Sequence, residues 1–150
     1  ADFSMLLQVP PRIDCAYCSL VAEYFSRQQI IELSKALFDK LSIGGIIAFF
    51  EWGRHFKYDD AVCADIYFPR GISKKDWLLI CAELTEYVEN PHRIVQEEIN
   101  GENKFKRFGT RSQYTVGINI GTFDVEHADK QKTPSADFVH YCILQKQSVP

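Results

Sequence analysis

The segment SRQQIIELSKALFDKLSIGGIIAFF, residues 26–50, decides the fold. Ser26 and Gln29 have the spacing of a capping box, in which each side chain binds a free backbone N–H at a helix start. The apolar residues that follow recur at helical spacing, so they predict an amphipathic helix from Ser26 to Leu41. Gly44-Gly45 then ends the helix and turns the chain. Ile46–Phe50 is an unbroken apolar run, which is typical of a strand buried on both faces. The expected helical stripe consists of Ile30, Leu33, Leu37 and Leu41, with Ile31 and Phe38 beside it.

A second helix is predicted from Ser73 to Val88. Ser73 caps it, and Asp76 lies in the first turn near the positive end of the helix dipole. Its expected buried stripe is Trp77, Ile80, Cys81, Leu84 and Val88. Asn90-Pro91 ends this helix, because the residue before a proline disfavours helical backbone.

The remaining segments favour strands. Asn100-Gly101 between two such segments is a strong hairpin signal. Ile13–Phe25 fits either a strand entering a short helix or one helix, and periodicity does not decide between them. The expected strands, besides Ile46–Phe50, are Phe3–Val9, Val62–Phe68, Ile94–Ile99, Lys104–Phe108, residues 114–121 and Phe138–Leu144.

This order of elements predicts an α+β fold. We expect a mainly antiparallel sheet of about five to six strands, with two main amphipathic helices packed on one face. The length of 150 residues favours a single domain over residues 1–150.

Composition excludes several classes of protein. The chain is 46% hydrophobic, which argues against disorder, and its longest apolar run is far shorter than a membrane span. A net charge of −3 makes nucleic acid an unexpected partner, since phosphate binding favours a basic surface. The odd number of cysteines and the lack of a leader-like N-terminus favour a cytoplasmic protein with reduced thiols.

Two cysteine motifs raise the question of a metal site. Cys15 and Cys18 form a CxxC, and His140 and Cys142 would share one face of a strand. Together they could supply four zinc ligands. Cysteines also commonly fill protein cores, so we expect no metal or other cofactor.

The segment Glu51–Asp60 is the strongest candidate for binding, because aromatic and charged side chains gather there between two expected strands. We predict a protein-binding surface at Trp52, His55, Tyr58, Asp59 and Asp60. His55 could act as a general base, but no nucleophile accompanies it, so no catalytic residue is predicted. The leading hypothesis is a non-enzymatic cytosolic protein-binding module, an inhibitor or immunity-type antagonist of a basic protein partner.

The alternative rests on a resemblance. Residues 14–25, DCAYCSLVAEYF, followed by a helix and by residues 41–51, LSIGGIIAFFE, resemble the middle of a class I S-adenosylmethionine methyltransferase. In that family a strand, a short helix, a longer helix and a Gly-Gly turn into a buried strand follow in this order. Phe138–Lys146 is similar to the last strand of that fold. The family's glycine-rich cofactor loop and ribose-binding acidic residue have no counterpart here, so the resemblance implies a partial or degenerate domain and assigns no site residues.

Overall fold

The computed structural model describes residues 10–53, 62–63, 68, 71–90, 92–99, 102–109, 112–124 and 138–150. Its elements are, in chain order, β1 (Ile13–Ser19), the 3-10 helix η2 (Ala22–Tyr24), α1 (Arg27–Lys40), β2 (Leu41–Trp52), α2 (Lys74–Glu89), β3 (His92–Ile99), β4 (Glu102–Gly109), β5 (Tyr114–Asp124) and β6 (Phe138–Ser148).

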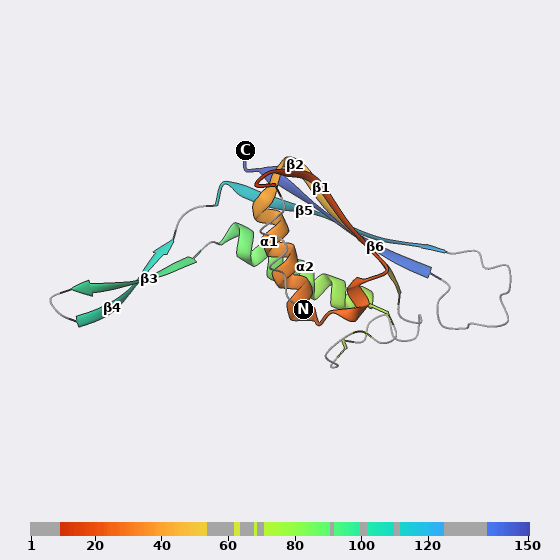
Figure 1. Ribbon diagram of the computed structural model, residues 1–150, viewed down its shortest axis with the longest axis horizontal. Helices are drawn as coiled ribbons and strands as arrows, with labels where there is room; N and C mark the ends of the chain where they lie inside the picture. The colour runs from red at the N-terminus through yellow and green to blue at the C-terminus, as the bar shows by residue number, and fades with distance from the viewer. Residues whose placement is uncertain are drawn as a thin grey trace.

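The main sheet has four strands in the order β1-β2-β6-β5, and it is mixed (Figure 1). β1 and β2 pair in parallel, whereas β6 runs antiparallel to both β2 and β5. The prediction of a mainly antiparallel sheet with five to six strands is therefore wrong, although the α+β class is consistent with the structure. The physical reason lies in the connection between β1 and β2, which contains η2 and α1. A helical crossover of this length returns the chain parallel to its first strand.

Strand assignments elsewhere were partly correct. The ambiguous segment Ile13–Phe25 is a strand followed by a short helix. β3 and β4 pair with each other as the expected hairpin, in a separate two-stranded sheet. Phe3–Val9 lies outside the described residues. Of Val62–Phe68, the described residues Val62, Cys63 and Phe68 belong to no strand.

Both main helices form as the sequence predicts. Ser26 and Gln29 make both hydrogen bonds of the capping box, and Ser73 caps α2 by accepting from the Asp76 amide. The expected stripe of α2 is buried in full. On α1 the buried residues are Ile30, Ile31, Ser34 and Phe38, while Leu33 and Leu37 are only partly covered. The stripe is rotated because Ser34 is small and bonds to the Ile30 carbonyl within its own helix, which lets α1 approach its neighbours on that side.

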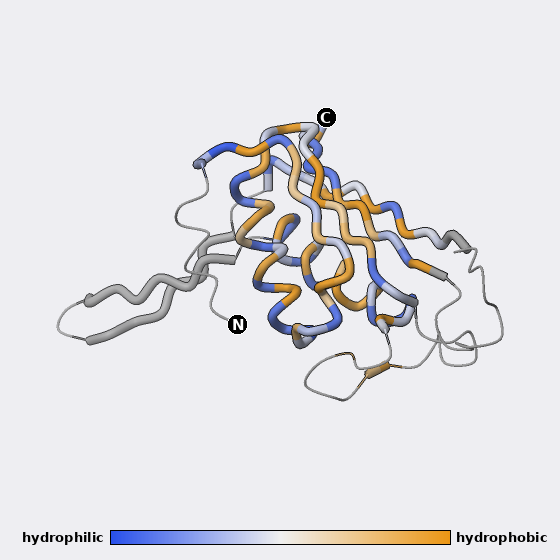
Figure 2. The backbone as a smooth tube through the Cα atoms, turned by 45° about the vertical axis from the view of Figure 1, so that its right-hand side comes forward, coloured by the Kyte–Doolittle hydropathy of each residue, from blue (hydrophilic) through white to orange (hydrophobic). Residues whose placement is uncertain are grey.

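The core lies between the sheet and the two helices, which pack on the same face (Figure 1). In Figure 2 hydrophobic and hydrophilic residues alternate along the two helices that lie beside the strands. Trp77 of α2 is fully buried, and its ring lies 5.3 Å from that of Phe49 in β2. At the carboxyl end of α1, Lys146 of β6 donates to the last-turn carbonyl of Phe38 at 3.2 Å. None of the helices in the described part of the chain combines the length and the apolar character needed to cross a membrane.

Candidate functional site

The carboxyl ends of β1 and β2 meet at one edge of the sheet, because these two strands are parallel. At this edge β1 leads into η2 and α1, while the chain after β2 returns through Ile72 into α2. Ile72 bridges to Gly53 in parallel and donates its N–H to the Trp52 carbonyl at 3.0 Å. Both helices therefore begin at the edge where the two strands end. Ligands of α/β sheets bind most often outside the carboxyl ends of parallel strands.

Glu51 occupies the end of β2 and is fully buried. Side chains alternate along a strand, so Glu51 shares the helix-covered face with Ile47 and Phe49. Its Oε1 accepts a hydrogen bond from the Trp52 amide at 3.1 Å. Its Oε2 is buried with no hydrogen-bond partner among the residues that the structure describes. A buried acceptor without a partner costs free energy, and such groups are often found at functional sites.

The environment of Glu51 favours its neutral form. Burial raises the pKa of Glu51 from 4.5 to about 7, and the nearby charge of Glu23 adds to this effect. The backbone amides of Trp52, Glu23 and Ala22 act in the opposite direction and lower the pKa, but burial dominates. A carboxyl group with this pKa exchanges its proton close to neutral pH, which is the range useful for acid–base chemistry.

Three further side chains belong with Glu51, and we refer to Cys18, Glu23, Glu51 and His140 as the Glu51 cluster. His140 of β6 is directly opposite Glu51 in the antiparallel register, and it is 1% exposed. Its Nδ1 lies 2.7 Å from the Thr122 hydroxyl of β5. Burial raises the pKa of Cys18, and the charge of Glu51 raises it further. The cluster thus joins titratable groups from β1, η2, β2 and β6.

The turn after β1 has an unusual backbone. Leu20 adopts a φ of 56°, the left-handed region that non-glycine residues rarely enter. It is held there by a hydrogen bond from its amide to the Phe50 carbonyl, at 2.8 Å. Strained residues of this kind gather at functional sites, where the surrounding structure fixes them. This turn delivers η2, and with it Glu23, to the Glu51 cluster.

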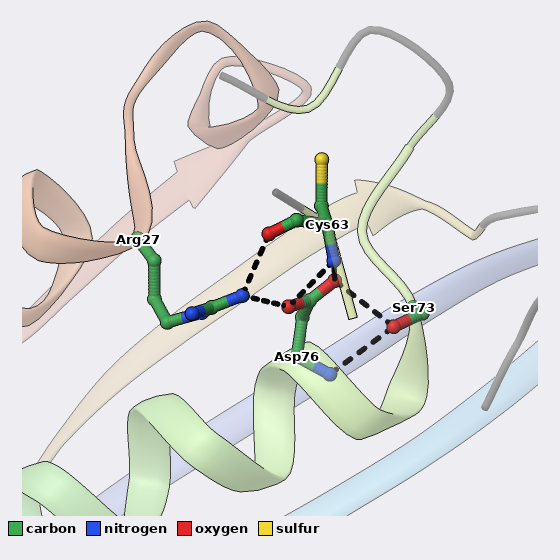
Figure 3. A network of polar contacts seen from close by, with 4 residues as sticks. All are labelled: Arg27, Cys63, Ser73 and Asp76. Carbon is green, nitrogen blue, oxygen red and sulfur yellow. Dashed lines mark hydrogen bonds and ion pairs between the residues drawn. The ribbon is translucent and has the colours of Figure 1, made fainter. Parts of the chain in front are cut away.

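A second polar network joins the beginnings of the two helices (Figure 3). Arg27 of α1 donates from Nη2 to Asp76 Oδ1 at 2.7 Å and to the Cys63 carbonyl at 2.9 Å. Asp76 also accepts from the Cys63 amide and from the Ser73 hydroxyl. The Asp76 carboxylate is fully buried and the Arg27 side chain is about one-third exposed. The network fixes α1, α2 and the segment at Cys63 around the carboxyl edge.

Most of the predicted binding surface lies outside the described residues. This holds for His55, Tyr58, Asp59 and Asp60, so their assignment stays a prediction. Trp52 is described, and it lies half-buried at the end of β2, next to Glu51. The sequence interpretation placed Glu51 in a loop and gave it no role. The alternation of Ile47, Phe49 and Glu51 would have indicated that it continues the buried face of the strand.

The four possible zinc ligands do not assemble as a group. Cys15 is exposed on β1, which β2 separates from β6, and Cys142 contacts Cys81 of α2 at an Sγ–Sγ distance of 3.5 Å. Within the described ranges, no three His, Cys, Asp or Glu side chains are grouped so as to hold a metal ion. His140 and Cys142 share the buried face of β6, as their spacing predicts.

The raised pKa of Glu51 predicts a pH dependence of stability. The folded state holds the proton up to about pH 7, whereas the unfolded chain releases it near 4.5. The contribution is therefore fully present below pH 4.5 and is lost as the pH rises through 7. We expect the wild type to lose about 1–2 kcal/mol relative to Glu51→Gln over this range, a figure reduced for solvent screening. Urea unfolding of both proteins at several pH values measures this difference in the free energy of unfolding.

The matched control for this experiment is Glu83→Gln, which changes an exposed carboxyl group on α2. That variant is expected to follow the wild-type pH profile. If the free energy of unfolding of Glu51→Gln changed with pH in the same way as that of the wild type from pH 4.5 to 7, Glu51 would not titrate in this range.

Comparison with known proteins gives few matches. No protein-family model and no curated protein matches the chain. Among solved structures, the chain is similar to an S-adenosylmethionine-dependent methyltransferase from Listeria monocytogenes, with 14% identity and a TM-score of 0.41. It is also similar to one from Methanosarcina mazei, with 9% identity and a TM-score of 0.39. Both alignments cover 93% of this chain, which spans 63% and 61% of those two proteins.

The leading hypothesis on function, a non-enzymatic protein-binding module, is not retained. Both solved structures to which the chain is similar are named as S-adenosylmethionine-dependent methyltransferases. The alternative agrees better with the structure, because strand, short helix, long helix and buried strand occur in the order that the methyltransferase resemblance implies.

Proposed function

We propose that this chain is part of a class I S-adenosylmethionine-dependent methyltransferase-like domain. In this proposal the carboxyl edge of β1 and β2 lies beside the group that receives the methyl. The observation that supports it most is the topology of the chain itself. β1, η2, α1 and β2 form a parallel strand pair with a helical crossover, and β6 lies reversed against β2. Five free cysteines are in keeping with a cytoplasmic location for this domain.

Glu51 is the residue with the clearest chemical role in the proposed site. Its Oε2 is buried and has no partner among the described residues, so it can accept a hydrogen bond or a proton from a molecule that reaches this buried position. The pKa of about 7 lets it do so near neutral pH. Glu23 and His140 act as positioning residues, since Glu23 raises the pKa of Glu51 and His140 lies beside it in the sheet.

The described residues supply part of a cofactor site, the unpartnered Glu51 Oε2, but they lack the glycine-rich turn between a strand and a helix that usually cradles a nucleoside. β1 ends at Ser19 and leads into Leu20 and Val21 instead. At the same edge, a Cβ on Gly71 would lie 2.6 Å from the Trp52 carbonyl oxygen. A glycine is needed here because the backbone packs closely against the end of β2. No chemical step is therefore assigned to S-adenosylmethionine on these residues.

Calorimetric titration of the whole chain tests the proposal. We expect saturable binding of S-adenosylmethionine, and of its demethylated product, with a Kd below about 1 mM. ATP is the matched control ligand, because it shares the adenosine but lacks the sulfonium, and it should give no saturable heat. If the folded chain binds neither S-adenosylmethionine nor its product at this concentration, the proposal is wrong.

A further inference from the structure

We propose that Cys81 and Cys142 form an oxidation site, at which a peroxide converts two buried thiols into a disulfide that links α2 to β6. This proposal is independent of the proposed function. It concerns the interior of the fold, between α2 and β6.

The two sulfur atoms are already in contact. Their Sγ–Sγ distance is 3.5 Å, and the residues are 2% and 0% exposed. Cys81 lies on the buried stripe of α2, and Cys142 lies in the middle of β6, opposite Phe49 of β2 and Ile120 of β5. A disulfide bond is about 2.05 Å long, so the sulfurs need to approach by about 1.5 Å. Rotation of the two side chains supplies part of this movement.

The CxxC motif, which suggests redox chemistry in the sequence, is less suited to it in the fold. Cys15 and Cys18 lie three residues apart on β1, so the alternation of side chains directs them to opposite faces of the sheet. They therefore cannot form a disulfide with each other while β1 is intact. The pair brought together by the fold comes from two elements that are 61 residues apart in sequence.

The chemistry balances with hydrogen peroxide as the oxidant. One thiol attacks the peroxide and becomes a sulfenic acid, while the O–O bond breaks and one water leaves. The second thiol then attacks that sulfur, so the S–S bond forms, the S–O bond breaks and a second water leaves. Two thiols are oxidised, and one peroxide is reduced to two waters.

The reaction is expected to be slow. The hydrogen bond to Cys81 and burial both raise the pKa of the Cys142 thiol, and the thiolate is the reactive form. Peroxide therefore has to enter during local opening of α2. The product closes a large loop in the unfolded chain, which stabilises the folded state, and we expect Tm to rise by about 5–10 °C.

The test uses the Cys15→Ser, Cys18→Ser double variant, which removes the motif on β1 and keeps Cys63, Cys81 and Cys142. After peroxide treatment of the folded protein, we expect a mass loss of about 2 Da and a peptide that links Cys81 to Cys142. Thiols counted after unfolding should fall from three to one. Tm should rise and return to its starting value on reduction with dithiothreitol.

Cys81→Ala and Cys142→Ala in the same background are the controls, and each should abolish the mass loss. If one of these two variants does not fold, the other is still a valid control. Mapping the linked peptide in the Cys15→Ser, Cys18→Ser protein requires neither of them. A disulfide to Cys63, oxygen addition without a link, or three thiols remaining after prolonged oxidation would each overturn the proposal.

Discussion

Replacing Asp76 with alanine is expected to lower the free energy of unfolding by about 2–4 kcal/mol, because it leaves the partly buried Arg27 charge and two further hydrogen-bond donors without their acceptor. Asp76 accepts from the Arg27 guanidinium at 2.7 Å, from the Ser73 hydroxyl at 3.0 Å and from the Cys63 amide at 3.1 Å. These three donors come from separate parts of the chain. Their common acceptor therefore stabilises the contact between them as well as the start of α2. Urea unfolding measures this loss of stability. The dependence of the free energy of unfolding on urea concentration should have the same slope in the variant and the wild type.

The matched control is Glu32→Ala, which removes the carboxylate of the surface pair with Lys35. That pair has an N–O distance of 3.5 Å between exposed or partly exposed side chains. Its loss is expected to change stability by less than about 0.5 kcal/mol. If Asp76→Ala cost no more than the control, the network would not stabilise the fold, and the carboxyl edge would need another support.

The second large effect is expected at Trp77. Trp77→Ala should lower the free energy of unfolding by about 3–5 kcal/mol, since it removes a fully buried indole from the centre of the core. The indole packs on Phe49 with ring centroids 5.3 Å apart, so α2 also loses this contact with β2. Thermal or urea unfolding checks the value. Leu78→Ala, at the next and half-exposed position, is the control and should change stability by less than about 1 kcal/mol.

A further variant separates packing from polarity at this position. The Trp77 Nε1–H is buried without a hydrogen-bond partner among the described residues. Trp77→Phe keeps an aromatic ring and removes this donor, so it should cost clearly less than Trp77→Ala. Equal losses for both variants would contradict the packing that the structure places between α2 and β2.

Local signals in the sequence predicted the helices well. Ser26 with Gln29, and Ser73 with Asp76, mark helix starts by hydrogen bonds between residues three apart, so the signal is contained in a short window. The apolar stripe of α2 has the same local character. The stripe of α1 was predicted in part: Leu33 and Leu37 are only partly covered and Ser34 is buried in addition, because packing around the small Ser34 depends on neighbours that are distant in sequence.

The pairing of strands could not be predicted in the same way. Whether β1 runs parallel or antiparallel to β2 depends on the path of η2 and α1, and the segment Ile13–Phe25 has no clear period. Register is likewise non-local, and it is register that puts Glu51 beside His140. The sequence interpretation therefore gave no role to Glu51, the buried carboxyl group next to Trp52.

The central proposal is that the carboxyl edge of β1 and β2 is the binding edge of a methyltransferase-like domain. The most direct test is a two-dimensional NMR titration of the amide groups with S-adenosylmethionine. The account predicts saturable shifts at Ser19, Glu23, Glu51 and Trp52, and none at Ser42, Gly44 and Gln147 on the opposite edge of the sheet. Shifts confined to that opposite edge, or no shifts at saturating ligand, would contradict it.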